Sequence, residues 1–476
     1  MFLTPAGWSS PLLEGLAALI YVLLALTVSV DVLLKKSDVR GALGWIAAVW
    51  LSPILGALLY YMFGINRVTR RAARFGRLDK APSVSADALT EAESNIALLC
   101  GASARLSDSP LTAGNRVEIL AGGDAAYPVM LAAIEQAKGC IALASYIFRN
   151  DAAGRRFTDA LIAAHKRGVA VRILLDSVGI GYFLPLAYWR MRRAGVPAAR
   201  FLHTWVPWRM PFLNMRNHRK ILVVDGRTAF IGGMNVGAEN CRSLSPKHHI
   251  EDVHFRVEGP GVRPVMETFA RDWVFTTEER LDDPCWWPKL DAKGPVFLRG
   301  LSSGPDADIY KLEMILGVAL SVARQRVRIV TPYFLPDARL QFSIAEAVLR
   351  GVEVEIVLPS QSDWLFMDWA TRGHLRFFSH IEAKIYMTPR PFDHTKLAVV
   401  DGEWSLIGSS NWDARSFRLN FEYDLECYDR ALATDLEALI DAKVARAQRI
   451  TPESLAARHI LVRLRDAAAR LMMPYL

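Results

Sequence analysis

Cysteine is scarce in this chain and follows no recognisable spacing. Five cysteines occur among 476 residues, and no two of them form a C-x-x-C pair. An odd number of widely spaced cysteines favours reduced, buried thiols over a disulfide framework or a zinc site. The sequence therefore predicts neither stabilising disulfides nor a bound metal.

A large excess of either charge is also missing. The chain has 57 lysines and arginines against 49 aspartates and glutamates, a net charge of +8. This moderate excess suits an anionic partner, either a phospholipid surface or a nucleic acid. The sequence has no separate basic stripe with interleaved aromatic residues, which a strand-binding groove would need. We therefore expect no nucleic-acid partner.

Charge is nearly absent from two long N-terminal runs. From Gly15 to Leu34 the only charged residue is Asp31, and from Gly41 to Gly64 there is none. Each run has about the length that crosses a bilayer as a helix, and aromatic residues stand near the ends of the second. No lysine or arginine precedes Lys35, which disfavours a cleaved signal peptide. The sequence predicts a transmembrane helical hairpin over residues 1–66, with buried core helices as the alternative.

A repeated pattern occupies most of the remaining chain. An apolar strand ending in an aromatic residue, an amphipathic helix, Arg-Gly-Val and a second apolar strand occur at 141–175 and again at 327–358. Strands that alternate with helices predict an α/β fold. We expect a connector over 67–110, a first domain over 111–290, a second domain over 291–450 and an amphipathic helix over 451–476.

Each half of the repeat contains the spacing H-x-K-x-x-x-x-D. A single His-x-Lys on a strand is usually an ordinary exposed pair, but the repetition of the whole pattern predicts a functional site. Seventeen residues after each histidine stands an asparagine, and an acidic residue follows later. The residues in the first half are His218, Lys220, Asp225, Asn235 and Asp252, and those in the second half are His394, Lys396, Asp401, Asn411 and Glu422.

The local pattern indicates phosphate chemistry. Side chains two residues apart on a strand share a face, so each histidine and its lysine point the same way. The ammonium neutralises phosphate oxygens, and the imidazole supplies a nucleophile or a proton. Two such half-sites predict double displacement through a phosphohistidine, with Asp252 and Glu422 orienting the imidazoles. Asp225 and Asp401 are candidates for the same chemistry, although each opens an Asp-Gly turn, which favours a structural role.

The paired motifs resemble those of the phospholipase D superfamily. Longer stretches, Asn217–Asn235, Arg256–Pro260, Thr331–Phe334 and Arg415–Glu422, are similar to bacterial cardiolipin synthases. The resemblance implies two pseudo-twofold-related phospholipase D-like α/β domains that share one site, behind the N-terminal hairpin.

The resemblance also implies a reaction. A phosphatidyl group would pass from one phosphatidylglycerol to another with release of glycerol, without a metal or other cofactor. By analogy His218 would be the nucleophile and His394 the general acid, with Asn235 and Asn411 binding substrate. The synthases usually carry Trp-Arg directly before the first acidic residue, where this chain has Ile250-Glu251. Donor and acceptor preference therefore stay open, and a hydrolase, a membrane-tethered phosphodiesterase or nuclease, and a silent scaffold are the alternatives.

Basic residues predict the orientation in the membrane. The flank from Arg67 to Lys80 carries six basic residues against one acidic residue, whereas the loop between the two apolar runs carries three against one. The positive-inside rule then predicts a multi-pass protein of the bacterial inner membrane with cytoplasmic catalytic domains. At the other end, Thr451-Pro452 predicts the start of a helix that rests on the membrane or on the domain surface.

Overall fold

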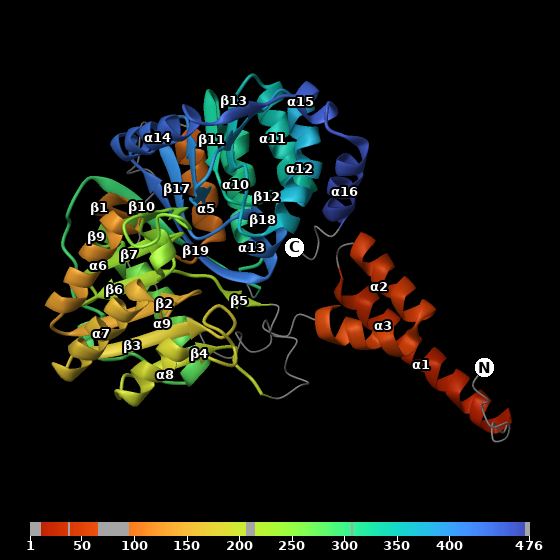
Figure 1. The fold of residues 1–476 in the computed structure, drawn as a ribbon, viewed down its shortest axis with the longest axis horizontal. Coiled ribbons are helices and arrows are strands. Elements are labelled where there is room, and N and C mark those ends of the chain that lie inside the picture. The colour runs from red at the N-terminus through yellow and green to blue at the C-terminus, as the bar shows by residue number, and fades with distance from the viewer. Residues whose placement is uncertain (1–10, 37–38, 65–94, 206–214, 306–307, 472–476) are drawn as a thin grey trace. The chain divides into compact units, whose positions relative to one another are not determined.

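The computed structural model of the chain divides into two compact units (Figure 1). The first comprises residues 1–70 and 204–214, and the second contains all the others. The described residues are 11–36, 39–64, 95–205, 215–305 and 308–471. The basic flank that predicts membrane orientation lies outside these described ranges.

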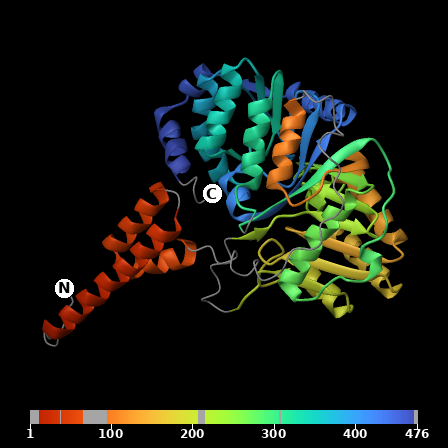
Figure 2. The same cartoon turned by 180° about the vertical axis from the view of Figure 1, so that it is seen from behind.

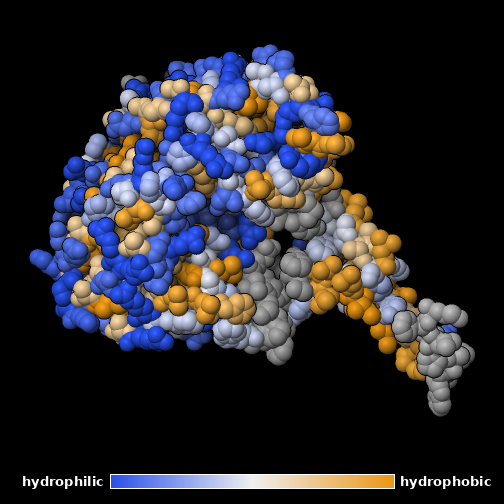
Figure 3. All heavy atoms as spheres, in the orientation of Figure 1, coloured by the Kyte–Doolittle hydropathy of each residue, from blue (hydrophilic) through white to orange (hydrophobic). Residues whose placement is uncertain are grey.

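The first apolar run forms a single long helix. Helix α1 (Pro11–Lys35) has 25 residues, a length of about 37 Å at 1.5 Å per residue. Within the described part of the chain it is the one helix long and apolar enough to cross a membrane. Its outer surface is apolar, as the space-filling view shows (Figure 3). The prediction of a first span is therefore compatible with the structure.

The second apolar run is broken, contrary to the predicted continuous helix. It forms α2 (Val39–Leu51), α3 (Pro53–Leu59) and a π-helical turn, η1 (Tyr60–Gly64). Proline lacks an amide hydrogen and clashes with the preceding helical turn, so Pro53 ends α2 and begins α3. Helix α3 packs closely on α2 at Gly56, where an added Cβ would lie 2.5 Å from the carbonyl oxygen of Ala48. The transmembrane hairpin is thus not confirmed.

The three N-terminal helices pack on one another through a small core. Val32 and Val49 are fully buried in it, and Tyr60 is 2% exposed. The Tyr60 hydroxyl donates to a carboxylate oxygen of Asp31 at 2.8 Å. The single acidic residue of the first apolar run is therefore hydrogen-bonded within this unit.

The larger unit is built on one continuous sheet. The first repeat supplies β1 (Thr112–Ala121), β2 (Cys140–Ser145), β3 (Ala170–Asp176), β4 (Ala198–Phe201), β6 (Ile221–Val224), β7 (Thr228–Gly232) and β9 (Val253–Glu258). The second supplies β10 (Val296–Ser303), β11 (Arg326–Val330), β13 (Glu353–Pro359), β14 (Lys384–Thr388), β16 (Leu397–Val400), β17 (Trp404–Gly408), β19 (Asn420–Tyr428) and β20 (Gln448–Ile450).

Strand order confirms the predicted duplication. Outward from the junction, the first repeat runs β1-β9-β7-β6-β2-β3-β4 and the second runs β10-β19-β17-β16-β11-β13-β14, with β20 added at its edge. Strands β1 and β10 occupy the same place in the two orders and pair antiparallel at the junction. The two repeats therefore follow one topology and meet in a pseudo-twofold arrangement.

Helices cover both faces of the sheet (Figures 1 and 2). The first repeat contributes α6 (Gly123–Gln136), α7 (Ala152–Lys166), α8 (Leu186–Arg193), α9 (Val262–Thr277), η4 (Ala238–Asn240) and η5 (Pro284–Trp286). The second contributes α10 (Lys311–Val322), α11 (Ala338–Leu349), α12 (Leu365–His380), α13 (Ala414–Arg418) and α14 (Arg430–Val444). Strands buried on both faces are apolar throughout, which explains the uninterrupted apolar runs of β6 and β16.

Part of the predicted connector belongs to the core of the second repeat. Helix α5 (Asn95–Leu106) packs beside α10 and buries Leu99 and Cys100 completely (Figure 2). All five cysteines are free, and four of them are buried. The prediction of buried thiols holds for four of the cysteines, whereas Cys285 is half-buried.

The C-terminal segment forms two helices, α15 (Pro452–Ala456) and α16 (Ile460–Leu471). Thr451 caps the first of them as predicted, because its hydroxyl accepts the Ser454 amide and the Ser454 hydroxyl contacts the Thr451 backbone. Helix α16 packs against α12 through buried Asp466 and Ala469. Of the two predicted resting places the structure has the domain surface, and the leucines of α16 remain exposed.

Two short bridges tie the repeats together beside the site. Strand β5 (Arg216–Asn217) pairs with the start of β19, and β8 (Ile250–Glu251) pairs with β15 (Phe392–Asp393). Each bridge joins the residues directly before a motif histidine to the residues directly before the acidic residue of the other repeat. A third short pairing, between β12 (Phe334–Leu335) and β18 (Trp412–Asp413), lies within the second repeat.

Candidate active site

The two motif histidines enter the site directly after these bridges. The His218 amide donates to the carbonyl of Phe421 at 2.9 Å, and the His394 amide donates to that of Glu251 at 2.7 Å. Backbone pairing between the repeats therefore fixes where each imidazole begins. Both histidines line one pocket of about 360 Å³, together with Asn235 and Asn411. The structure thus brings the two predicted half-sites together.

Each imidazole is held by a carboxylate from the opposite repeat. His218 Nδ1 lies 2.9 Å from Glu422 Oε2, and His394 Nδ1 lies 2.7 Å from Asp252 Oδ2. Both carboxylates are buried. A carboxylate at Nδ1 favours a proton on that nitrogen, which leaves Nε2 available for chemistry. The predicted orienting role of both acids fits this geometry, and the pairing crosses between the repeats.

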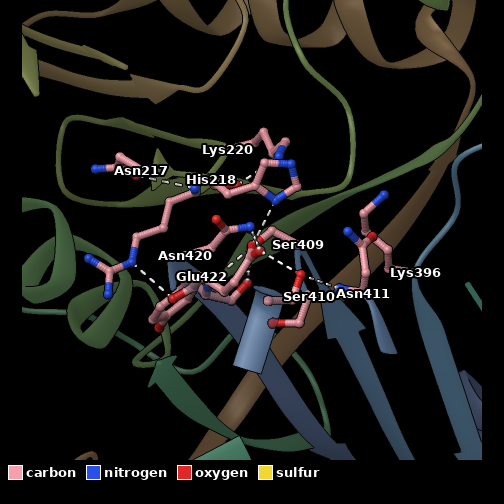
Figure 4. A network of polar contacts seen from close by, with 12 residues as sticks. Asn217, His218, Lys220, Lys396, Ser409, Ser410, Asn411, Asn420 and Glu422 are labelled. Atoms are coloured by element: carbon pink, nitrogen blue, oxygen red, sulfur yellow. Dashed lines mark hydrogen bonds and ion pairs between the residues drawn. The ribbon is translucent and has the colours of Figure 1, made fainter. Parts of the chain in front are cut away.

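Glu422 is fixed by several donors besides the imidazole (Figure 4). The Ser409 hydroxyl donates to it at 2.6 Å, the Ser416 hydroxyl at 3.0 Å and the Asn420 amide at 3.2 Å. Burial raises the pKa of Glu422 to about 7, whereas the nearby Lys220 and these hydrogen bonds oppose that rise. The network holds the carboxylate in a single orientation.

The counterpart of Ser409 in the first repeat is Gly233, and the difference has a steric reason. A Cβ on Gly233 would lie 2.5 Å from a carboxylate oxygen of Asp252. Glycine therefore makes room for Asp252, whereas serine donates to the longer Glu422. The difference between Gly232-Gly233 and Gly408-Ser409 was visible in the sequence. The spacing of the motifs could not show which carboxylate each residue contacts.

The two motif lysines are buried beside their histidines. Lys220 Nζ donates to the His218 carbonyl at 2.7 Å, and Lys396 Nζ donates to the His394 carbonyl at 2.6 Å. Burial lowers the pKa of Lys220 to about 7 and that of Lys396 to about 8. A bound phosphate would stabilise the charged form of both ammonium groups.

Burial and the neighbouring lysines also act on the imidazoles. The pKa of His218 is lowered well below its ordinary value by burial, then by Lys220 and Lys396. The pKa of His394 is lowered by burial and Lys396, but its hydrogen bond to Asp252 raises it in opposition. The two environments therefore differ, because Asp252 opposes the lowering of the pKa at His394.

The two asparagines line the pocket but differ in their contacts. Asn235 Oδ1 accepts the Ile147 amide at 3.1 Å. Asn411 Oδ1 is buried and has no hydrogen-bond partner among the described residues. An amide held at the wall of the pocket is suited to bind an oxygen of the substrate, so the predicted substrate-binding role remains a proposal.

Asp225 and Asp401 are not among the residues that line the pocket, and a catalytic role for them stays a prediction. Each stands five residues after its lysine, beyond a four-residue strand, which is about 16 Å along the chain at 3.3 Å per residue. Asp225 accepts the amides of Lys138, Gly139 and Cys140 at 2.7 to 3.2 Å. Asp401 accepts the amides of residues 324, 325 and 326 at 2.8 Å. Each carboxylate therefore holds a neighbouring backbone segment by hydrogen bonds, which fits the structural role that the Asp-Gly turns favour.

Two groups of site residues were missed from the sequence. The Tyr146 ring packs edge-on against His218 at 5.0 Å between centroids, and the Tyr333 ring lies 6.4 Å from that of His394. Arg219 is buried, donates to the Glu422 carbonyl at 2.9 Å and pairs with Asp272. The predicted strands ended in different aromatic residues, Phe148 and Phe334, and spacing alone could not place Tyr146 and Tyr333 beside the histidines.

The described residues contain no group of three or more histidine, cysteine or acidic side chains arranged to hold a metal ion. The groups at the pocket include the two imidazoles, their carboxylates, two ammonium groups and the neighbouring amides. This set can attack a phosphodiester, neutralise its oxygens and protonate a leaving alcohol.

Comparison with known proteins agrees with this geometry. A family model described as "Cardiolipin synthase, PLD-like domain" matches residues 130–273 and 317–444, and one described as "Phospholipase_D-nuclease N-terminal" matches 23–64. Cardiolipin synthase A of Pseudomonas putida W619 is 33% identical, over 98% of this chain and 100% of its own. The major cardiolipin synthase of Bacillus subtilis 168 is 30% identical, over 97% of this chain and 99% of its own.

A solved structure supports the fold. Phosphatidylserine synthase of Haemophilus influenzae Rd KW20 superimposes with a TM-score of 0.63 at 16% sequence identity, covering 80% of this chain and all of that one. The cardiolipin synthase model matches one segment in each repeat, and each of these two segments contains a motif histidine. The chain therefore belongs to the cardiolipin synthase family of phospholipase D-like proteins.

Proposed function

We propose that this chain condenses two phosphatidylglycerol molecules into cardiolipin and glycerol, through a phosphohistidine on His218. The observation that carries the proposal is the shared pocket, in which two imidazoles, each held by a buried carboxylate, stand beside two buried lysines. The relatives named cardiolipin synthase match over almost the entire chain. The N-terminal apolar helix fits association with a membrane, where the lipid substrates are found.

In the first step, His218 Nε2 attacks the phosphorus of one phosphatidylglycerol. A P–N bond forms, and the bond from phosphorus to the headgroup glycerol breaks, with the oxygen retaining the electron pair. Protonated His394 gives its proton to that oxygen. Lys220 and Lys396 neutralise the non-bridging oxygens as negative charge builds on them, which is the contribution expected of preorganised cations.

In the second step, the same groups exchange roles. Neutral His394 takes the proton from a glycerol hydroxyl of the second phosphatidylglycerol, and that oxygen attacks phosphorus. The P–N bond breaks, and His218 recovers its electron pair. Cardiolipin leaves, and His394 is again protonated. A positioned acid or base of this kind typically contributes about 10²- to 10⁴-fold to the rate.

The assignment of roles rests on the environments of the two imidazoles as well as on family resemblance. Burial and the motif lysines lower the pKa of both imidazoles, but the lowering is opposed by Asp252 at His394 and is very large at His218. A neutral imidazole is the nucleophile, and a charged one is the acid. We also propose that the chain is a multi-pass protein of the inner membrane whose catalytic body faces the cytoplasm, as its basic flank predicts.

The test is an assay of the purified full-length chain in liposomes of labelled phosphatidylglycerol, with products identified by mass. Cardiolipin and glycerol in equal amounts, with little phosphatidic acid, are expected. Predominant phosphatidic acid in the presence of abundant phosphatidylglycerol would replace the synthase with a phospholipase D-type hydrolase.

A further inference from the structure

The two sides of the pocket differ, although the repeats that build them share one topology. In one bridge, Arg216 of β5 stands opposite Asn420. In the equivalent bridge, Phe392 of β15 stands opposite Ile250. All four residues line the pocket. The bridge beside His218 is therefore polar and cationic, whereas the bridge beside His394 is apolar.

The two repeats also differ in charge four residues after the motif asparagines. Arg415 of α13 comes four residues after Asn411, and Glu239 of η4 comes four residues after Asn235. Both line the pocket. The second repeat thus places a cation where the first repeat places an acid. Arg216 and Arg415 reach the pocket from different repeats, so the cationic side is assembled only when both are folded.

The two arginines line the same pocket as the reacting histidine. Burial and then the charge of Arg216 lower the pKa of Arg415, whereas Asp413, Tyr146 and Asp176 act in the opposite direction. Both charges also act on the Tyr146 hydroxyl, whose ring packs against His218. Two neighbouring guanidinium groups with restricted access to water favour an anion between them. Their planar forks match the oxygens of a phosphate, which they bind in bidentate fashion.

The reacting phosphate already has its own cations, Lys220 and Lys396. A second phosphate is present only on the acceptor, because phosphatidylglycerol carries a phosphodiester on the glycerol that supplies the attacking hydroxyl. The glycerol that joins the two phosphates of the product is short. The second phosphate must therefore lie within the same pocket as the first. Water and free glycerol, the competing acceptors, carry no such group.

We propose that Arg216 and Arg415 form a second phosphate subsite, which holds the phosphodiester of the acceptor phosphatidylglycerol. The subsite rests on the proposed function and deepens it. It places the acceptor hydroxyl at the phosphohistidine in preference to water. Arg216 and Arg415 are thus specificity-determining residues, and the enzyme makes cardiolipin rather than phosphatidic acid because of them.

The experiment compares Arg216→Gln and Arg415→Gln with the unaltered full-length chain in phosphatidylglycerol liposomes. Two quantities are measured: the ratio of cardiolipin to phosphatidic acid, and the incorporation of labelled free glycerol into phosphatidylglycerol. Glycerol exchange uses the same phosphohistidine but an acceptor without phosphate. We expect the ratio to fall roughly tenfold or more in each variant, since a charge-assisted pair is lost, while exchange stays within about twofold.

Two further variants sharpen the comparison. Arg415→Lys keeps the charge without the fork and should restore part of the ratio. Arg149→Gln removes an arginine from the rim of the pocket that is already paired with Glu239 at 2.9 Å, and should leave the ratio unchanged. Retained glycerol exchange shows in each case that the site is folded.

The proposal is overturned if cardiolipin formation and glycerol exchange fall in parallel, because the arginines would then serve the first step or the fold. It is also overturned if the ratio is unchanged in both glutamine variants. Failure of the proposed function is a separate result: the unaltered chain would produce no cardiolipin while still exchanging or hydrolysing the headgroup.

Discussion

At the scale of single residues, the site depends on contacts that cross between the repeats. Glu422 holds His218, and the two residues are 204 positions apart in the sequence. Asp252 holds His394 in the same way. Neither repeat therefore supplies both a motif histidine and the carboxylate that contacts it. An orienting carboxylate fixes the tautomer and the direction of the ring, so its loss should affect turnover while leaving the imidazole present.

Four variants test this arrangement. His218→Ala and His394→Ala are each expected to abolish turnover, because one removes the nucleophile and the other removes the acid. Glu422→Gln and Asp252→Asn should lower kcat by about 100-fold or more with little change in thermal unfolding. A phosphoryl-enzyme trapped from labelled lipid should map to His218. Near-normal turnover in either alanine variant would exclude the double-displacement mechanism.

The two buried lysines should make phosphate binding depend on pH. Their pKa values, about 7 for Lys220 and about 8 for Lys396, lie below the ordinary 10.5. Bound phosphate favours the protonated form, so it should bind more weakly as pH rises through these values. Without ligand, the unfolded chain holds protons that the folded lysines have lost. The lysine contribution to the free energy of unfolding therefore rises with pH between about 7 and about 10.5.

The measurement is the increase in Tm that inorganic phosphate produces in the detergent-solubilised chain. We expect a larger increase at about pH 6 than at about pH 9.5, because only the protonated lysines attract the anion. Lys220→Met and Lys396→Met together provide the control, in which the dependence should largely disappear. Equal increases at both pH values in the unaltered chain would contradict the lysine assignment.

At the scale of elements, the sequence predicted what is local and missed what depends on distant partners. The Asp-Gly hairpins formed as expected, with Asp225 and Asp401 at a φ of 51°. Their role at turns was visible because type and spacing of neighbouring residues determine a tight turn. The sequence did not show that each carboxylate contacts the histidine of the other repeat, because this depends on how strands far apart in the sequence pair. Pro53 itself indicated a helix break, but the length of the uncharged run favoured the prediction of one continuous helix.

Asp225 and Asp401 are therefore expected to stabilise the fold without taking part in chemistry. Asp225→Ala and Asp401→Ala each remove the acceptor of three backbone amides, at a cost of about 1 to 3 kcal/mol in the free energy of unfolding. Turnover per folded molecule should remain close to that of the unaltered chain. The exposed Asp435→Ala serves as a control for both quantities. A loss of turnover without a loss of stability would return these carboxylates to the mechanism.

At the scale of the whole molecule, the duplication makes one enzyme from two incomplete halves. The sheet continues from one repeat into the other through the pairing of β1 with β10. The short bridges then bring a histidine of each repeat to a carboxylate of the other. This plan also allows asymmetry, because each wall of the pocket can change without disturbing the common topology. The pocket shows such an asymmetry, with Arg216 and Arg415 on one side and Ile250 and Phe392 on the other.

The number of membrane crossings decides which side of the bilayer the pocket serves. If α1 and the broken second run both cross, the loop at Ser37 lies outside and Lys80 lies inside. If α1 alone crosses, both positions lie on one side. Ser37→Cys and Lys80→Cys, each in a Cys285→Ser background, can be probed in intact cells with a membrane-impermeant thiol reagent. The other four cysteines are buried, so background labelling should be low.

We expect labelling at Ser37→Cys and none at Lys80→Cys until the cells are opened. This pattern would establish the hairpin with the catalytic body in the cytoplasm, as the six basic residues between Arg67 and Lys80 predict. Labelling at neither position in intact cells would leave α1 as the single crossing while keeping the body inside. Labelling at Lys80→Cys would place the body outside, and the donor lipid would then have to come from the outer leaflet of the inner membrane.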